Sequence, residues 1–329
     1  MEETIIKVMD LKKYFPLSVG FFRSIITRNI PVVKAVDGIS FDIKKGEIFG
    51  LAGESGSGKT TTGRLILRLV EPTSGKIYFH NTEITSIPAK KFKDFRKKMQ
   101  IIFQDPYESL NPKMTIKDII AEPLRVQGEK DENVIMERVY QTLEDVELVP
   151  PEEFIYRFPH ELSGGQRQRV ACARALVVKP EFIVADEPVS MLDVSIRAEI
   201  LNLMIDLVEK YNVSFLYITH DLALARHLCN RLAVMYLGKI VERGFIEDII
   251  GNPLHPYTKA LLKAVPVPDP KARRVDVVIK GEIPSPINPP GGCRFHTRCP
   301  EIIGDICRKE EPKLLRVDKD HYVACHLYS

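Results

Sequence analysis

One eight-residue stretch constrains the fold more than any other part of the chain. Residues 53–60 read Gly-Glu-Ser-Gly-Ser-Gly-Lys-Thr, which fits the pattern G-x-x-x-x-G-K-[ST]. Small residues at this spacing let successive backbone N–H groups turn inward around a phosphate, and the helix predicted to follow presents its positive end. An apolar, strand-like run at 48–52 comes directly before the loop. The order strand, loop, helix predicts a phosphate-binding loop in which Lys59 reaches the β- and γ-phosphates and Thr60 ligates Mg²⁺.

A second apolar strand ends in two acids. Residues 182–187 read Phe-Ile-Val-Ala-Asp-Glu. Asp186 is placed to hold Mg²⁺ through water, and Glu187 to polarise the attacking water as a general base. On its own, Asp-Glu after a strand is more often a helix cap or a solvated turn. The phosphate loop upstream favours the catalytic interpretation.

A third small-residue turn lies between these two motifs. Residues 162–166 read Leu-Ser-Gly-Gly-Gln and open a helix predicted over 166–178. The start of a helix after such a turn can bind an anion, although a plain helix cap explains the same residues. Two phosphate-binding loops in one chain require an explanation.

These three motifs resemble those of the nucleotide-binding subunit of an ABC transporter. Residues 53–60 are similar to the Walker A loop, 162–166 to the signature loop and 182–187 to the Walker B strand. The resemblance implies a head-to-tail dimer, in which the signature loop of one subunit closes on ATP held by the Walker A loop of the other. It also implies the catalytic residues Glu187, His220 (the switch histidine) and Gln104 (the Q-loop).

The resemblance implies a fuller set of site residues as well. Tyr14 is similar to the aromatic residue that stacks on adenine, and Asp193 lies in a D-loop-like stretch at 190–193. Mg²⁺ is expected at Thr60, Gln104 and Asp186. The residues expected to bind ATP are Tyr14, Gly53, Glu54, Ser55, Gly56, Ser57, Gly58, Lys59, Thr60, Thr61, Ser163, Gly164, Gly165, Gln166 and Asp193.

Several further segments resemble the oligopeptide/dipeptide importer branch of this family, namely 61–64, 100–106, 109–112 and 255–258. The stretches 13–16 and 69–75 are similar to the second of that system's two ATPase subunits. This implies a heterodimer with a homologous ATPase, two transmembrane permease subunits and an extracytoplasmic solute-binding protein, with this chain peripheral on the cytoplasmic face of the cell membrane. The branch also includes importers of nickel and of oligosaccharides, and an ATPase subunit does not touch the cargo.

The pattern along the chain predicts an α/β fold. Strand-like runs fill the first 50 or so residues, helical patterns dominate about 106–162, and helices alternate with β-branched runs from 166 to 250, which indicates a parallel sheet. With the resemblance, this implies a P-loop ABC-type ATPase with an N-terminal antiparallel β subdomain, a RecA-like parallel-sheet core and an α-helical subdomain. We expect this domain over 1–251 and a C-terminal extension over 252–329. Nine of the 23 prolines lie between 252 and 290, which predicts an extended connector there.

Four of the six cysteines, Cys293, Cys299, Cys307 and Cys325, fall in this extension. Four thiolates suit Zn²⁺ or an iron–sulfur cluster, although the spacing fits neither a zinc finger nor a bacterial ferredoxin, and unrelated buried cysteines explain the residue types too. A short proline-rich tail has little core of its own and needs a staple. The resemblance to the oligopeptide/dipeptide branch implies a [4Fe–4S] cluster. Cys172 and Cys229 are interpreted as core thiols.

Charge and hydropathy argue against several other classes of protein. The formal net charge is only +3, which disfavours wholesale nucleic-acid binding. No uncharged apolar run approaches the roughly 18 residues of a membrane helix, and the start of the chain has no signal-peptide pattern. The alternative from another class, a soluble ABC ATPase in DNA repair or translation, is disfavoured because the chain has one cassette and no long coiled-coil insertion. The apolar insertion at 19–26 is interpreted either as a hairpin on its own domain or as a contact with a membrane subunit or lipid headgroups.

Overall fold

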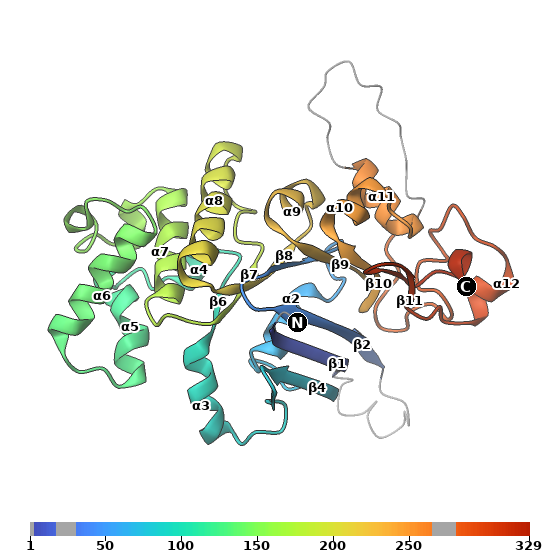
Figure 1. The fold of residues 1–329 in the computed structure, drawn as a ribbon, viewed down its shortest axis with the longest axis horizontal. Coiled ribbons are helices and arrows are strands. Elements are labelled where there is room, and N and C mark those ends of the chain that lie inside the picture. Colours follow the sequence, from blue (N-terminus) through green and yellow to red (C-terminus); the bar gives the residue numbers. More distant parts are fainter. Residues whose placement is uncertain (1–2, 18–30, 265–280) are drawn as a thin grey trace, which may run out of the picture. The chain divides into compact units, whose positions relative to one another are not determined.

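The computed structural model describes residues 3–17, 31–264 and 281–329. The apolar insertion at 19–26 therefore lies outside the described residues, as does part of the proline-rich connector. Figure 1 shows the ribbon of the chain. By its internal contacts the chain divides into two compact units. Unit 1 comprises Met1–Ile5, Ile43–Ile48 and Ser86–Tyr217, and unit 2 comprises Ile6–Asp42, Phe49–Thr85 and Ile218–Ser329. These units do not follow the boundary expected at Gly251, and that boundary stays a prediction.

Unit 1 combines three strands with a set of helices. The strand order is β8 (Ser214–Thr219), β7 (Phe182–Asp186) and β6 (Met99–Ile102), with β6 parallel to β7. Both β7 and β8 are buried along their whole length. The helices are α3 (Ala89–Lys98), α4 (Pro106–Ser109), α5 (Ile116–Gln127), α6 (Glu132–Asp145), α7 (Gly164–Leu176) and α8 (Val194–Tyr211), with short 3-10 turns at Pro151–Glu153 and Pro159–Glu161.

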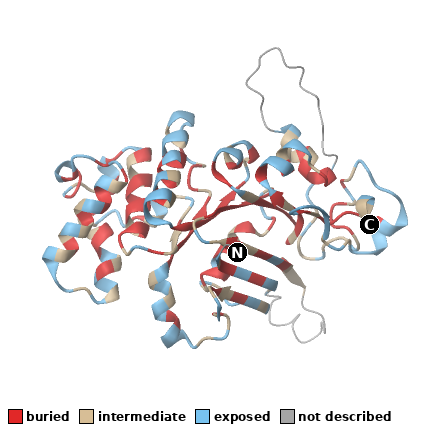
Figure 2. Ribbon diagram, viewed as in Figure 1, coloured by how far each residue is buried: buried red, intermediate tan, exposed pale blue. Residues whose placement is uncertain are grey.

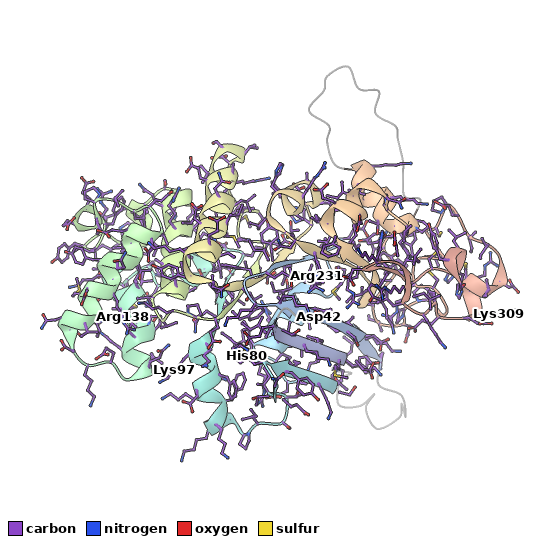
Figure 3. The ribbon with its side chains drawn as sticks, in the orientation of Figure 1. Asp42, His80, Lys97, Arg138, Arg231 and Lys309 are labelled. Carbon is purple, nitrogen blue, oxygen red and sulfur yellow. The ribbon has the colours of Figure 1, made fainter. Side chains whose placement is uncertain are left out.

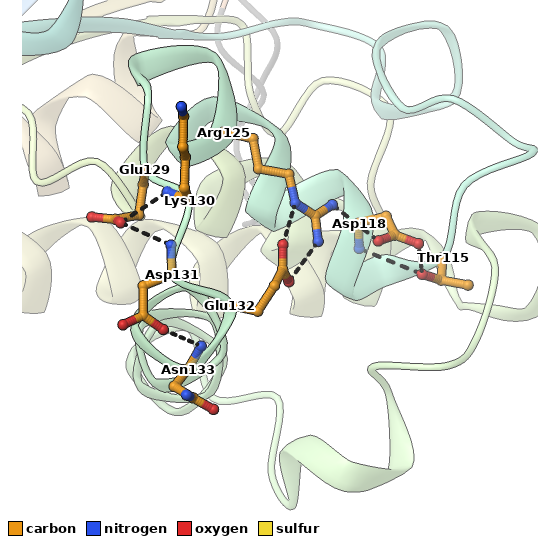
Figure 4. A network of polar contacts seen from close by, with 8 residues as sticks. All are labelled: Thr115, Asp118, Arg125, Glu129, Lys130, Asp131, Glu132 and Asn133. Atoms are coloured by element: carbon orange, nitrogen blue, oxygen red, sulfur yellow. Dashed lines mark hydrogen bonds and ion pairs between the residues drawn. The ribbon is translucent and has the colours of Figure 1, made fainter.

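The stretch 106–162 is mostly helical, as the sequence pattern predicts, and contains α4, α5, α6 and the two 3-10 turns. α5, α6 and α7 pack against one another; α5 and α6 each bury one face and expose the other, whereas α7 has no exposed residue (Figure 2). Arg125 joins two of them, because its guanidinium contacts Asp118 of α5 at 3.2 Å and Glu132 of α6 at 3.0 Å (Figure 4). The hydrogen bond from Thr115, which caps α5, lowers the pKa of Asp118 and keeps it charged for this contact.

Unit 2 contains two groups of strands. One is a four-stranded sheet in the order β2 (Val32–Lys44), β1 (Thr4–Pro16), β4 (Ser74–Phe79) and β5 (Thr82–Glu83). β1 and β4 are antiparallel, as are β4 and β5, which confirms the expected antiparallel β subdomain. Arg231 of β9 (Arg231–Tyr236) donates to the backbone carbonyl (2.9 Å) and the carboxylate (3.2 Å) of Asp42 in β2 (Figure 3).

The second group is mixed, and this corrects the prediction of a parallel-sheet core. β3 (Ile48–Ala52) is parallel to β9, but β10 (Lys239–Phe245) is antiparallel to β9 and to β12 (His321–Val323), which pairs in turn with β11 (Leu315–Asp318). The reason is the two-residue turn Leu237-Gly238, whose positive φ angles (43° and 79°) fit a tight hairpin. The alternation of helices and strands does not reveal such a hairpin.

The remaining helices of unit 2 are α2 (Lys59–Ile66), α9 (Leu222–Leu228), α10 (Ile246–Gly251), α11 (Pro256–Ala264) and α12 (Asp305–Lys309), with a 3-10 turn at His326–Tyr328. α11 corrects the expectation of an extended connector throughout 252–290. Proline density did not prevent this helix because Pro256 is its first residue, where a helix needs no backbone donor.

Candidate functional site

The predicted phosphate loop joins β3 to α2, as the sequence order predicts. The Lys59 ammonium nitrogen Nζ donates to the carbonyl oxygens of Gly53 (2.7 Å) and Glu54 (3.0 Å), and the residue is 5 % exposed. The loop therefore wraps around a buried positive charge. Ser57 accepts a hydrogen bond from the Gly238 N–H at its carbonyl (2.8 Å). Its hydroxyl is buried and, within the part of the chain that the structure describes, has no hydrogen-bond partner, which fits an anionic ligand at the loop.

Two glycines of the loop could not carry a side chain. Gly53 has a φ of +151°, and a Cβ there would lie 2.2 Å from the carbonyl oxygen of Met235. Gly58 has a φ of +105°, and a Cβ there would lie 2.1 Å from the carbonyl oxygen of Ala35. The backbone approaches its neighbours this closely only because both residues are glycine.

Tyr14, the predicted adenine-stacking residue, lies in β1 of the same unit. Its hydroxyl donates to the Asp37 carboxylate, and Lys34 Nζ lies 5.7 Å from its ring centre. Burial and the bond to Asp37 raise the pKa of Tyr14 to about 12, so it stays protonated. Burial opposes ionisation of Asp37, but the bond from Tyr14 and the charges of Lys239 and Arg294 lower its pKa overall. His220, also in unit 2, follows β8 along the chain and is exposed.

The second group of predicted residues lies in unit 1. Gln104 Nε2 donates to Glu187 Oε2 over 3.3 Å, so the predicted Q-loop residue and the predicted base are in contact. Glu187 has a φ of 47°, in the left-handed region that a non-glycine residue seldom adopts, and its carbonyl accepts from the Ser190 hydroxyl at 3.0 Å. Asp186, the last residue of β7, is 4 % exposed.

The predicted signature turn opens α7, also in unit 1. Ser163 caps this helix by accepting from the Gln166 N–H (3.3 Å), and the Gln166 side chain accepts from the Ser163 N–H (3.0 Å). A Cβ on Gly165 would lie 2.7 Å from the Cγ2 atom of Ile196 in α8. The turn is therefore packed against the start of α8, where Asp193 is the N-cap residue.

All six cysteines are free thiols. The backbones of Cys293 and Cys307 are joined by a hydrogen bond of 2.9 Å. Burial raises the pKa of Cys293 to about 11, and the negative charges of the other three cysteines of the extension add to the shift. Over residues 3–17, 31–264 and 281–329, however, no group of three or more His, Cys, Asp or Glu side chains is arranged to hold a metal ion. The expected four-cysteine metal site is thus not seen as a preformed arrangement.

Sequence reasoning missed two contacts that Glu54 of the phosphate loop makes, with Arg298 and with Tyr257. Arg298 donates to both carboxylate oxygens of Glu54, at 2.8 and 3.2 Å, and the Tyr257 hydroxyl accepts from the Glu54 N–H at 2.8 Å. The only signal was that two arginines stand between Cys293 and Cys299 in the printed sequence. Nothing in their spacing indicates a partner so far away along the chain.

Comparisons with known proteins identify the fold and the family of this chain. The family model "ABC transporter" matches residues 36–190, and "Oligopeptide/dipeptide transporter, C-terminal region" matches residues 241–307. The chain is similar to cbiO1 from Clostridium perfringens, part of the ABC transporter complex cbiONQ (TM-score 0.65, 27 % identity, covering 76 % of this chain and 92 % of that one). It is also similar to a dimeric ATP-binding cassette in a post-hydrolysis state bound to ADP and Pi (TM-score 0.64, 28 % identity, 74 % and 99 % covered). The fold is therefore that of an ATP-binding cassette ATPase.

Relatives with similar sequences show which family of ATP-binding cassette ATPases the chain belongs to. The chain is 49 % identical to the oligopeptide transport ATP-binding protein AppF of Bacillus subtilis over 331 residues, which covers 100 % of this chain and 98 % of the relative. It is 50 % identical over 293 residues to a putative peptide import ATP-binding protein of Brucella ovis (89 % and 92 % covered). The chain belongs to the family of ATP-binding proteins of oligopeptide/dipeptide ABC transporters. In the described part of the chain, no helix is long and apolar enough to cross a membrane.

Proposed function

We propose that this chain hydrolyses ATP to power the import of oligopeptides or dipeptides through an ABC transporter. The observation that carries the proposal is the full-length match at 49 % identity to an oligopeptide transport ATP-binding protein, together with the oligopeptide/dipeptide model at 241–307. These relatives favour peptides over nickel or oligosaccharides as cargo. They also favour transport over a role in DNA repair or translation.

The site residues divide into two functional groups in this proposal. Lys59 and the loop around it hold the β- and γ-phosphates, Tyr14 stacks on adenine, and Thr60, Gln104 and Asp186 hold Mg²⁺. Glu187 polarises the attacking water, with Gln104 and His220 assisting. The contact between Gln104 and Glu187 (3.3 Å) supports this assignment, because it joins the proposed base to a residue proposed to hold Mg²⁺.

The proposed assembly is a heterodimer with a homologous ATPase, on the cytoplasmic face of two permease subunits that receive peptide from a solute-binding protein. Ser163, Gly164, Gly165 and Gln166 would face ATP on the partner ATPase, and Asp193 would lie beside them. A helix that begins at Gly164 and is capped by Ser163 supports this role, since helix starts attract phosphate. The chain would supply one half of each of two ATP sites.

Reconstitution of the complex tests this assembly. We expect the ATPase rate of vesicles containing this chain, its partner ATPase and the permeases to rise about tenfold when a peptide-loaded binding protein is added, because closure assembles both sites. The binding protein without peptide serves as the control. An ATPase rate that ignores the loaded binding protein would count against a transport role.

The four cysteines Cys293, Cys299, Cys307 and Cys325 are proposed to bind a [4Fe–4S] cluster, with Zn²⁺ as the alternative. The residue types suit either group, because four free cysteines of one described segment can supply four thiolate ligands. A bound cation would offset the repulsion among their thiolates and cross-link a segment that has little core of its own.

Replacing one proposed ligand tests this assignment. We expect Cys293→Ser, purified without oxygen, to lose its iron and its visible absorbance, because a cluster needs its thiolate ligands. Cys172→Ser is the matched control, since Cys172 is a buried free thiol in α7. Iron and zinc are measured by elemental analysis. If the wild-type protein is colourless and holds one zinc, the bound group is Zn²⁺ rather than a cluster. If the wild-type protein holds neither metal, the proposed metal site is wrong.

A further inference from the structure

Two arginines of the segment 293–299 contact the surroundings of the proposed ATP site: Arg298 contacts the phosphate loop, and Arg294 contacts Asp37, the residue bonded to Tyr14. At the phosphate end, the Arg298 guanidinium makes a two-pronged ion pair with Glu54, the second residue of the phosphate loop. The side chain of Arg298 is 7 % exposed and that of Glu54 is 23 % exposed, so water screens the pair weakly. Paired hydrogen bonds of this kind fix orientation as well as charge. Tyr257 holds the backbone of the same residue, by accepting from the Glu54 N–H at 2.8 Å.

At the base end, Arg294 donates to the Asp37 carboxylate, and the Tyr14 hydroxyl donates to that same carboxylate. Arg294 also donates to the carbonyl of Leu237, in the turn between β9 and β10. The next residue of that turn, Gly238, accepts from the Asp37 N–H at 2.9 Å and donates to the Ser57 carbonyl of the phosphate loop at 2.8 Å. The turn thus connects the partner of Tyr14 to the phosphate loop.

The segment that carries both arginines is itself anchored. Phe295 is 1 % exposed, and its ring centre lies 5.2 Å from that of Tyr236 and 5.3 Å from that of Tyr257. Arg298 also donates to the Tyr236 hydroxyl at 3.3 Å. Arg294 and Arg298 therefore extend from either side of a packed aromatic residue, which limits how far either guanidinium can move.

We propose that Arg294 and Arg298 are positioning residues for ATP: Arg298 holds and neutralises Glu54 at the phosphate loop, and Arg294 orients Tyr14 through Asp37. This rests on the ATP-binding roles proposed above for Tyr14 and residues 53–60. Electrostatics explains why Glu54 needs a positively charged partner. A carboxylate in a loop that surrounds a triphosphate repels the ligand, and the Arg298 charge offsets that repulsion. In this proposal the C-terminal extension helps to position the residues that bind ATP.

The phosphate-end contact is tested by a charge-rescue experiment on the full-length protein. Arg298→Ala leaves the Glu54 carboxylate unpaired beside the phosphates, and we expect MgATP to bind about tenfold more weakly by calorimetry. Adding Glu54→Gln removes that charge, so the double variant is expected to bind within about threefold of wild type. Arg298→Lys retains the charge without the paired geometry and is expected to lose about threefold. It provides the comparison if Arg298→Ala does not fold.

The base-end contact is tested by comparing two ligands. We expect Arg294→Ala to weaken MgATP binding about fivefold and to leave inorganic tripolyphosphate binding unchanged, because only ATP has a base to stack on Tyr14. Tyr14→Phe keeps the ring but loses the bond to Asp37, and is expected to behave in the same way. Arg298→Ala, by contrast, should weaken both ligands.

Arg316→Ala is the matched control, because Arg316 is an exposed arginine of the same extension that donates to the backbone carbonyls of Asp318 and Lys319. Its affinity for MgATP should equal that of wild type. Wild-type affinity in Arg298→Ala, or no recovery when Glu54→Gln is added, overturns the phosphate-end role. An equal loss of ATP and tripolyphosphate in Arg294→Ala overturns the base-end role. A wild-type protein that binds neither ligand would instead refute the proposed ATP site itself.

Discussion

The Glu187→Gln variant is expected to bind MgATP with wild-type affinity and to hydrolyse it about 100- to 10,000-fold more slowly, the usual contribution of a general base. Glutamine keeps the shape of the side chain and can still contact Gln104, but it cannot take a proton from water. Because ATP then stays bound, the variant should also trap the closed pair of ATPase subunits. Single-turnover hydrolysis and size-exclusion chromatography with MgATP measure both effects.

Glu209→Gln is the matched control, since Glu209 is an exposed acid on α8 of the same unit. We expect it to hydrolyse ATP at the wild-type rate. Wild-type turnover in Glu187→Gln would rule out Glu187 as the base and leave His220 as the next candidate. Loss of MgATP binding in the same variant would mean that Glu187 supports the fold of the site rather than the chemistry.

The Lys59→Ala variant is expected to lose at least about 30-fold in MgATP affinity, because truncating a buried, hydrogen-bonded charge at a binding site costs roughly 2–5 kcal/mol. Lys59 bonds two carbonyls of its own loop, at 2.7 and 3.0 Å. The substitution therefore removes both the charge that attracts phosphate and a tie within the loop. Calorimetry in the Glu187→Gln background measures the affinity without hydrolysis of the ligand.

Lys7→Ala serves as the control, because Lys7 is an exposed lysine on β1. Its affinity for MgATP should match that of the background protein. If Lys59→Ala bound MgATP within threefold of the background, the loop at 53–60 would not be the main phosphate contact, and the assignment of the whole site would fail.

Sequence predicted those parts of this molecule that depend on local chemistry. The strand, loop and helix around Lys59 follow from residue size and periodicity, and so does the cap of α7 at Ser163. The hairpin at Leu237-Gly238 was missed, because a two-residue turn without Asn, Asp or a double glycine gives a weak signal. The ion pair between Glu54 and Arg298 could not be predicted, because it joins distant parts of the chain through the packing around Phe295.

Peptide uptake tests the central claim most directly. Vesicles would contain this chain, the proposed partner ATPase and the two proposed permeases, with the solute-binding protein and a labelled oligopeptide outside. We expect the peptide to accumulate only when MgATP is inside, and accumulation to stop when Glu187→Gln replaces the wild-type chain. ATP hydrolysis without peptide accumulation, in vesicles that accumulate nickel or an oligosaccharide instead, would contradict the central claim.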